Sequence, residues 1–414
     1  MSRFDWSRSL RTKSTMGGRS LGAALVVLLV SFAHGGAAQA QALTVDDAID
    51  RAFAHAGLDA VSAASTDAIH ARADAEVVHP SARAFGDVEA VGGDGTSVEV
   101  TLGASWVVDP SGWRARQRDV AAWWAESDAA GRDGARLAIA TEVRRAFWLA
   151  RAHDARLAAF DARIDAASRG LAALQARYER GDVARYAVVR VERELAAVHA
   201  ERTSVQADRD AALAELRALT GAGSGVQPTG ALRPPREAMD PGAAPSIRAL
   251  DAAAQGWDAM GEVHQRWGLR DWELDAGYRL ARSAAATGHG GVVSLSIPIG
   301  GRATADAARA VARSEATLAR AERAHAEHLV DHHRTDARGR LDVAFAALDA
   351  LPADDTDDLV ALVEAAWAAG EAPLADVLDA WRSEAELTLL RIDLEWAARE
   401  AAIDLAATGL QEAP

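Results

Sequence analysis

The stretch AAWAAGEAPLADVLDAWRSEAELTLL, residues 365–390, interrupts a long Ala-rich amphipathic pattern with Gly370 and Pro373. Glycine is a poor helix former and proline breaks helices, so the pattern predicts two helices joined by a tight turn. A second stretch, QARYERGDVARYAVVRVERELAAVHA at residues 175–200, has the same layout, with an aromatic residue three positions before a glycine and an apolar pair seven and eight positions after it. The two glycines, Gly181 and Gly370, are 189 residues apart, which indicates an internal twofold repeat.

Residues 1–42 have the layout of a secretory signal peptide. A basic segment precedes the apolar run LGAALVVLLVSFA, and AAQAQA supplies small residues for cleavage after Ala40 or Ala42. A membrane anchor is the alternative, but the apolar run is shorter than the ~20 residues that a membrane-spanning helix needs. The sequence therefore predicts an exported protein.

Composition argues against several classes of protein. The chain has no cysteine, so the exported protein has neither disulfide bonds nor a lipid-modified cysteine after the signal. The net charge is −15 although the signal contributes +4, so the remainder is strongly acidic and nucleic acid is an unsuitable partner. Neither a Ser/His/Asp arrangement nor an H-E-x-x-H motif is present, so we expect no enzyme and no cofactor.

Each half of the chain also contains a pattern typical of strands. Residues 97–108, SVEVTLGASWVV, alternate apolar with polar or small residues, and residues 82–91 alternate more weakly before them. The second half predicts strands over 272–282 and 291–299, on either side of the glycine-rich turn ATGHGG. Residues 222–245, rich in Gly and Pro, are interpreted as a linker.

The predicted organisation is therefore a signal (1–42), a first repeat (43–221), the linker, and a second repeat (246–410). Each repeat contains a helix, two strands and a long helical hairpin, with its tip near residue 181 or 370. The opening helix is expected to run from Thr44 to about residue 78, where Pro80 follows. The descending helix of the second hairpin is expected to reach Trp367, although Pro352 falls inside it.

Four strands of this length suit a membrane-spanning barrel, which needs about 9–11 residues per strand. Four strands cannot close a barrel and open edges are not tolerated in lipid, so several chains must contribute, and a trimer would supply twelve strands. The apolar faces led by Leu102 and Leu274 should then meet lipid. The polar residues that should line the lumen are Glu99, Thr101, Ser105, Glu273, Asp275 and Arg279.

Several segments resemble the TolC-type outer-membrane efflux proteins: LTVDDAIDRAF, RYERG, AAWAAGEAPLADVLDA and GGVVSLSIPIGGR. The resemblance implies a mainly α fold with a small β part, in which long antiparallel helical hairpins form a tunnel and four strands per chain enter a trimeric twelve-stranded barrel. It implies an outer-membrane duct with a large periplasmic portion, partnered by a periplasmic adaptor and an inner-membrane pump, with drugs, metal ions or polypeptides as cargo. A soluble periplasmic coiled-coil adaptor is the alternative, and it leaves the four strands unexplained.

The resemblance gives both helix breaks a role. It implies that the tips dock end to end with hairpins of the adaptor, whereas a plain turn accounts for Gly and Pro equally well. The first tip departs from the family pattern, because Ala187-Val188-Val189 stand where Asp-Val-Leu is expected. The candidate docking residues are Gly181, Asp182, Val183, Ala184, Gly370, Glu371, Ala372 and Pro373.

Asp376 and Asp379 follow the second tip, and their spacing places them on one helical face. Carboxylates near a helix N-terminus are stabilised by the helix dipole, so capping is the ordinary explanation. The resemblance implies instead that each forms a ring of three charges that constricts the periplasmic mouth of a trimer. The first tip has Ala187 and Arg190 at the same offsets, so only the second should carry the rings, with Arg190 as a candidate latch to a carboxylate across the mouth.

Three histidines, His325, His328 and His332, occur at positions i, i+3 and i+7 of a predicted helix. Imidazoles at this spacing could bind Zn²⁺ or Cu²⁺. A solvated polar face explains them as well and is the preferred interpretation. We therefore predict no metal site and keep the three histidines as weak candidates.

Overall fold

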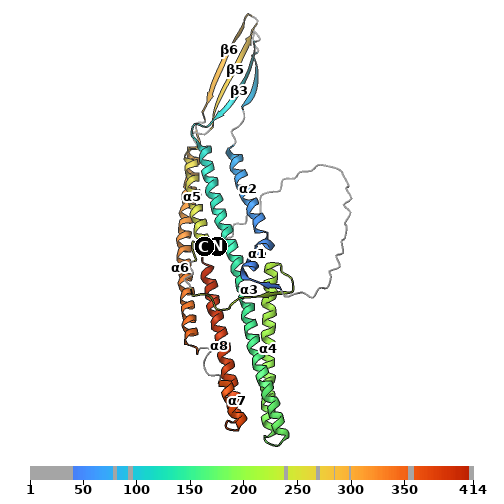
Figure 1. The fold of residues 1–414 in the computed structure, drawn as a ribbon. Coiled ribbons are helices and arrows are strands. Elements are labelled where there is room, and N and C mark those ends of the chain that lie inside the picture. The colour runs from blue at the N-terminus through green and yellow to red at the C-terminus, as the bar shows by residue number, and fades with distance from the viewer. Residues whose placement is uncertain are drawn as a thin grey trace, which may run out of the picture. The chain divides into compact units, whose positions relative to one another are not determined.

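The computed structural model describes residues 41–77, 82–91, 97–236, 241–266, 271–283, 285–297, 300–352 and 359–409. Residues 1–40, which hold nearly all of the predicted signal peptide, lie outside these ranges. The described part is mainly helical with an antiparallel sheet, which confirms the predicted class at that level (Figure 1). Within these ranges, no helix combines the length and the apolar character needed to cross a membrane.

The helices are α1 (Val45–Ala56), α2 (Leu58–Val77), α3 (Trp113–Glu179), α4 (Arg185–Thr220), α5 (Pro245–Arg266), α6 (Arg302–Ala350), α7 (Leu359–Ala369) and α8 (Leu374–Ala406). The strands are β1 (Gln41–Leu43), β2 (Arg83–Val91), β3 (Ser97–Val108), β4 (Val226–Pro228), β5 (Trp272–Arg282) and β6 (Thr287–Ser296).

The opening helix is two helices, not the single helix expected from Thr44 to residue 78. Thr44 caps α1 as predicted, because its hydroxyl accepts a hydrogen bond from the Asp47 amide at 3.2 Å. Gly57 then ends α1 with a φ of 63°, and its N–H donates to Ala54 O. This left-handed conformation suits glycine, and α2 begins at the next residue.

The predicted linker is not a free connection, because part of it forms structure. Its strand β4 pairs in parallel with β1, with Gln41 opposite Val226 and Leu43 opposite Pro228. Leu43 of β1 and Val226 of β4 are both buried in the main core. Val226 is thus a core residue although it lies in the predicted linker. Signal cleavage after Ala40 would leave β1 intact, whereas cleavage after Ala42 would remove two of its three residues.

An arginine of the last helix binds residues 231–233 of the predicted linker. Arg399 in α8 donates hydrogen bonds of 2.8–2.9 Å to the carbonyls of Ala231, Leu232 and Arg233. Its guanidinium lies over the Trp148 ring, 4.0 Å from the centroid. Burial lowers the pKa of Arg399 to about 10. The segment is therefore tied to both α8 and α3.

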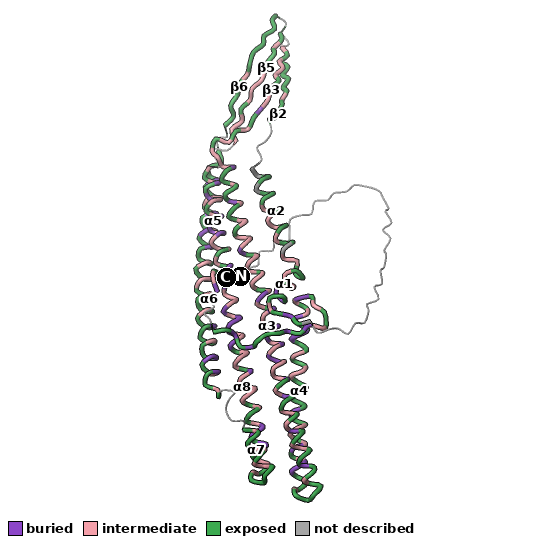
Figure 2. The backbone as a smooth tube through the Cα atoms, viewed as in Figure 1, coloured by how far each residue is buried: buried purple, intermediate pink, exposed green. Residues whose placement is uncertain are grey.

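α3 is the central helix of the described part. With 67 residues it is about 100 Å long, and it contacts α1, α2, α4, α5 and α8, while α6 packs on α5 and α8. Figure 2 shows buried residues spread along these helices, with the sheet and the hairpin ends largely exposed. The main core surrounds the fully buried Phe147 and joins residues of α1, α3, α4 and α8.

The second descending helix does not reach Trp367 without interruption. α6 ends at Ala350, and Leu351 has an extended backbone with ψ 146°. Proline disfavours the helical conformation of the residue before it and has no N–H to donate, so Pro352 explains the end of α6. The helical pattern returns in α7.

The sheet has the strand order β2-β3-β5-β6, and every neighbouring pair is antiparallel. β5 pairs with β3 along its full length, from Val98 opposite Arg282 to Val108 opposite Trp272. This central pairing joins the two halves of the chain. β2 and β6 are the edges of the sheet within one chain.

β6 begins earlier than the predicted strand over 291–299. It runs from Thr287 to Ser296, and Ile297 has left the strand. The ATGHGG segment is therefore mostly strand, and the hairpin closes before it, where the Ser283 N–H donates to Ala286 O at 2.9 Å. Extended glycine is compatible with a strand, and pairing with the long β5 determines the register of these residues. The predicted strand residues 298 and 299 lie outside the described ranges.

Candidate functional site

The first tip is a turn between α3 and α4 closed by a Schellman motif. The Gly181 N–H donates to Tyr178 O and the Asp182 N–H donates to Arg177 O, both at 2.9 Å. Gly181 has a φ of 83°, in the left-handed region. α4 begins at Arg185, and Ala184 is the extended residue that precedes its first turn.

The second tip, between α7 and α8, has the same motif. The Gly370 N–H donates to Trp367 O at 3.1 Å and the Glu371 N–H donates to Ala366 O at 2.9 Å. Gly370 has a φ of 80°, within a few degrees of the value at Gly181. The extended Pro373 precedes α8 as Ala184 precedes α4. The eight candidate docking residues therefore occupy equivalent turns, and all except Val183 and Ala372 are exposed.

The two tips lie side by side (Figure 1). Arg177 at the end of α3 donates hydrogen bonds to the carbonyls of Trp367 and Ala368 at the end of α7. Its guanidinium also lies 4.2 Å from the centroid of the Trp367 ring. Trp367, the aromatic residue before the second glycine, thus contacts the other hairpin.

A separate apolar cluster holds the ends of the four helices together. Three of the four apolar residues that follow the glycines belong to it, because Val188, Val377 and Leu378 are almost completely buried there. Val189 is half-buried and is not part of the cluster. The buried members are Ala167, Leu174, Ala187, Val188, Val191, Val377, Leu378 and Trp381. Ala187, where the family pattern has aspartate, lies in this cluster, so an aspartate there would place a carboxylate among apolar side chains.

Asp376 and Asp379 are exposed beside this cluster, in the first turns of α8. The Asp379 side chain is 71% exposed and lies 3.7 Å from an Arg382 nitrogen. Among the described residues no backbone N–H donates to either carboxylate, although Asp376 lies in the first turn of α8, where the helix dipole stabilises a carboxylate. Both carboxylates face away from the interior of the chain that carries them.

Arg190, the candidate latch, is exposed on α4 and makes no ion pair with a described residue. The ionic contacts at this level centre instead on Glu194, which the sequence did not single out. Its carboxylate lies 2.7 Å from an Arg163 nitrogen and 2.8 Å from an Arg382 nitrogen. Hydrogen bonds from Arg382, and then from Arg163, lower the pKa of Glu194 despite its burial.

The Glu194 contacts join three helices, because Arg163 is in α3, Glu194 in α4 and Arg382 in α8. Glu194 and Arg382 are 188 residues apart, so no local pattern in the sequence could have indicated the contact. We call these three residues the Glu194 clasp.

The three candidate metal ligands do not converge. His325, His328 and His332 are exposed on α6. Within the part of the chain that the structure describes, no group of three His, Asp or Glu side chains is placed to hold a metal ion. The nearest ring to His332 is its neighbour His333, with centroids 5.7 Å apart.

The register of the sheet separates its two faces as expected from the alternation. Ser105, Asp275 and Ser294 lie opposite one another on one face, where Ser294 donates a 2.6 Å hydrogen bond to Asp275. Glu99 and Arg279 form an ion pair on the same face. We call this the polar face.

The opposite face carries Leu102 opposite Tyr278, and Trp106 opposite Leu274. Leu102 is 63% exposed, while the neighbouring polar-face residues Thr101 and Gly103 are half-buried. The sheet therefore exposes its apolar side more than its polar side, which is the reverse of a sheet in a water-soluble protein. We call this the outward face.

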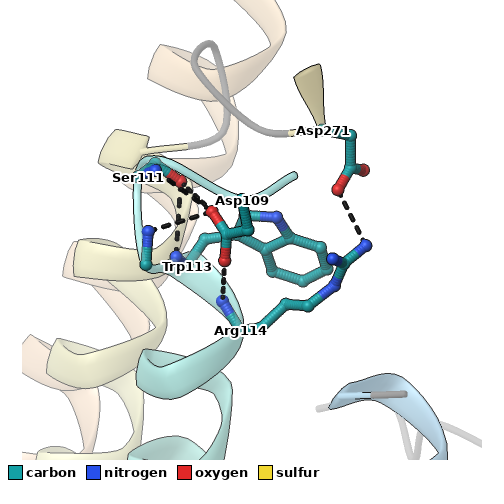
Figure 3. A network of polar contacts seen from close by, with 6 residues as sticks. Asp109, Ser111, Trp113, Arg114 and Asp271 are labelled. Carbon is teal, nitrogen blue, oxygen red and sulfur yellow. Dashed lines mark hydrogen bonds and ion pairs between the residues drawn. The ribbon is translucent and has the colours of Figure 1, made fainter. Parts of the chain in front are cut away.

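A polar network joins the sheet to the helices (Figure 3). Asp109, just after β3, accepts hydrogen bonds from the amides of Ser111, Gly112 and Arg114, at the start of α3. Burial acts to raise the pKa of Asp109, but these hydrogen bonds outweigh it and lower the pKa. Arg114 is buried and forms a 2.8 Å ion pair with Asp271, the residue before β5. This ion pair therefore connects the β3–α3 junction with the residue that precedes β5.

Comparison with known proteins agrees with this architecture. The family model for outer membrane efflux proteins matches residues 50–222. No curated protein sequence matches the chain.

Solved structures share the fold over most of the chain. A membrane protein from Pseudomonas aeruginosa is 19% identical, with a TM-score of 0.64 over 88% of this chain and 90% of its own. VceC, an outer membrane protein of Vibrio cholerae, is 18% identical, with a TM-score of 0.60 over 88% and 96%. The MtrE outer membrane channel of Neisseria gonorrhoeae, solved in its open state, is 17% identical, with a TM-score of 0.61 over 88% and 89%.

The fold is thus one found in outer-membrane channels. The family match over residues 50–222 agrees with the resemblance to TolC-type outer-membrane efflux proteins drawn from the sequence.

Proposed function

We propose that this chain is one subunit of the outer-membrane channel of a tripartite efflux pump or type I secretion system. Three copies form a passive duct that carries substrate across the periplasm and the outer membrane. An inner-membrane pump supplies the energy, and a periplasmic adaptor connects pump and duct. The chain itself carries out no chemical reaction.

The observation that carries this proposal is the four-stranded sheet with an exposed apolar face. Val88, Leu102, Tyr278, Val293 and Leu295 are all more than half exposed on the outward face. Exposing such a surface to water is unfavourable, and lipid removes that cost. The polar face would then line an aqueous lumen.

The edges of the sheet support assembly from several chains. Among the described residues, β2 and β6 each pair with a single strand, which leaves a row of backbone groups without a strand partner on each. Open edges are not tolerated in lipid, and pairing β2 of one copy with β6 of the next would satisfy both. Three copies would give twelve strands in a closed barrel. The order of elements in each half supports the proposed twofold repeat.

The helices would form the periplasmic part of the duct. α3 leads from the sheet to the first tip over about 100 Å, so the tips would lie far from the membrane. The two tips would then dock with hairpins of the adaptor. Their equivalent glycine turns and their exposure support this role.

The mouth of the duct would be constricted just above the second tip. Asp376 and Asp379 are exposed, and no backbone N–H of a described residue donates to either carboxylate. Around a threefold axis each would form a ring of three carboxylates, which attract cations. The first tip has Ala187 in the apolar cluster and so contributes no such ring.

Extraction and conductance test the proposal. The full-length protein, expressed with its signal, should be found in the outer membrane and require detergent for extraction. It should run as an oligomer that separates into monomers only on heating, and it should form conducting channels in planar bilayers. Release as a soluble monomer by osmotic shock would contradict the proposal and favour a soluble periplasmic protein.

A further inference from the structure

The outward face of the sheet is apolar except at one corner. Along β2 and β3 it presents only Gly, Ala, Val, Leu and Trp side chains, from Ala84 to Ala90 and from Val98 to Val108. Along β5 it is apolar from Trp272 to Leu280, with Tyr278 as its only hydroxyl-bearing residue. Its one charged residue among the described strands is Arg282, the last residue of β5.

Two further hydrogen-bonding side chains lie beside Arg282. Thr287 is directly opposite it in β6, and His289 follows two residues later on the same face. All three are exposed, and none of their side chains has a hydrogen bond or ion pair with a described residue. We call Arg282, Thr287 and His289 the outer corner.

Neighbouring residues define a shallow surface around this corner. The His289 ring stacks on Tyr278, with centroids 6.0 Å apart and an angle of 26° between the planes. Gly291, opposite Tyr278, has no side chain, and a β-carbon there would meet no atom within 4 Å. The stacked rings are therefore open to a ligand along one side.

The position of the corner along the strand matches the level of lipid headgroups. Trp272 is at the helix end of β5, and Arg282 is ten residues further, at the hairpin end. Ten residues span about 33 Å along a strand, or about 25 Å along the membrane normal at the tilt of a barrel strand. The apolar band of a membrane barrel is about 25 Å tall, so Arg282 lies at its border.

We propose that the outer corner binds the phosphate of an anionic lipid headgroup at the outer surface of the membrane. This inference rests on the proposed function, because it requires the outward face to be in lipid. The planar guanidinium of Arg282 can donate two hydrogen bonds to one phosphate, Thr287 adds a hydroxyl donor, and His289 adds an imidazole. Acyl chains of the same lipid would lie along Leu280 and Tyr278.

A headgroup is a better fit than free phosphate because the donors end an apolar surface. A free anion would gain only the polar contacts, at a site fully exposed to water and salt. A lipid adds the burial of its chains against the outward face. One corner per subunit predicts three lipid sites per trimer.

Native mass spectrometry of the full-length trimer in detergent tests the inference. Titration with phosphatidylglycerol or phosphatidylcholine should show up to three tightly bound phosphatidylglycerol molecules. One basic residue at a membrane surface contributes ~1 kcal/mol, so their affinity should exceed that of phosphatidylcholine about fivefold. The double variant Arg282→Gln with His289→Gln should bind the two lipids equally.

Arg83→Gln is the matched control, because Arg83 is an exposed arginine of the same sheet whose place opposite Ser105 puts it on the polar face. It should keep the preference of the wild-type trimer. A retained preference in the double variant would overturn the inference, as would displacement of phosphatidylglycerol by equimolar inorganic phosphate. Failure of the proposed function is distinguishable, because no trimer mass would be seen before lipid is added.

Discussion

The indole of Trp381 in α8 lies directly on Gly170 of α3, so closely that a β-carbon at Gly170 would overlap the ring. The same indole donates a 2.9 Å hydrogen bond to Glu364 in α7. Glycine in mid-helix is otherwise unfavourable, so its presence at residue 170 is explained by this contact. The contact brings the second hairpin against the first.

Replacing Gly170 by alanine should therefore destabilise the helical part. The added methyl group has to displace a buried indole, and overpacking of this kind costs about 1–3 kcal/mol. Gly131→Ala in the same helix is the control, because a β-carbon there meets no atom within 4 Å. It should be neutral or stabilising. Thermal unfolding of the two purified variants compares them, and equal stability would show that Trp381 can move away freely.

The Glu194 clasp should contribute stability that depends on pH. The pKa of Glu194 is below its ordinary value of 4.5, so the contribution is complete above pH 4.5 and is lost as the pH falls through the lowered pKa. Glu194→Gln should cost about 1.5–3 kcal/mol at pH 7, the range for hydrogen bonds to charged groups. The difference from wild type should shrink below pH 4.5.

Glu201→Gln is the control for the clasp. Glu201 is more than half exposed and lies 3.7 Å from an Arg163 nitrogen, so its loss should cost less than about 1 kcal/mol. Denaturant unfolding across the pH range measures both variants. A Glu194→Gln effect that stays constant down to pH 3 would contradict an ionic origin.

Two neighbouring residues of β6 should respond in opposite ways to a new charge. Val293 is on the outward face near the middle of the apolar band, so Val293→Arg should cost ~2–4 kcal/mol in a membrane. Ser294 is on the polar face beside Asp275, so Ser294→Arg should be tolerated. Leu274 and Asp275 should show the same contrast, with a smaller cost at Leu274 because it pairs with Trp106 nearer the edge of the band. Yield of heat-sensitive oligomer in outer membranes measures this, and equal yields would contradict the assignment of faces.

Valine at either tip glycine should abolish efflux while leaving oligomers in the membrane. A β-branched residue at a φ near 80° is strained, so the Schellman turn must change shape. A β-carbon at Gly181 or Gly370 meets no atom within 4 Å, so the effect comes from the turn and not from a clash. Export of a pump substrate from cells, together with the amount of oligomer, gives the result. Full efflux from both variants would exclude docking at the tips.

Removing both candidate gate carboxylates should change the ion preference of the channel. The variant Asp376→Ala with Asp379→Ala should lose cation preference and block by multivalent cations in planar bilayers, because two rings of negative charge would be absent. Asp210→Ala, an exposed position of α4 away from the tips, is the control. Unchanged selectivity in correctly assembled channels would show that the two aspartates do not line the mouth.

The sequence predicts correctly those elements that depend on neighbouring residues alone. The strand over 97–108 is present with the same bounds, since alternation over twelve residues is a strong signal. Both tips are present because glycine readily adopts the left-handed backbone conformation that ends a helix. The positions of the two aspartates beside a tip follow from the same reasoning, although what they line does not.

Features determined by distant partners were not predictable in this way. The pairing of Val226 with Gln41 makes a strand of a segment that looks like linker, and nothing near Val226 indicates it. The register of β6 is determined by its pairing with β5, whereas the glycines taken by themselves predict a turn. The Glu194 clasp and the Trp381–Gly170 contact each join helices from opposite halves of the chain. Pro352 was visible in the sequence, but the repeat pattern favoured a continuous helix.

The short β1–β4 pair has a consequence for the order in which the protein assembles. Export threads a chain N-terminus first, so residues 41–43 reach the periplasm before their partner residues 226–228. About 180 residues must follow before β1 can pair, and closing so long a loop is slow. The first residues to arrive therefore have no strand partner while the intervening residues enter the periplasm. An N-terminus created by cleavage after Ala40 would until then be accessible to periplasmic proteases and chaperones.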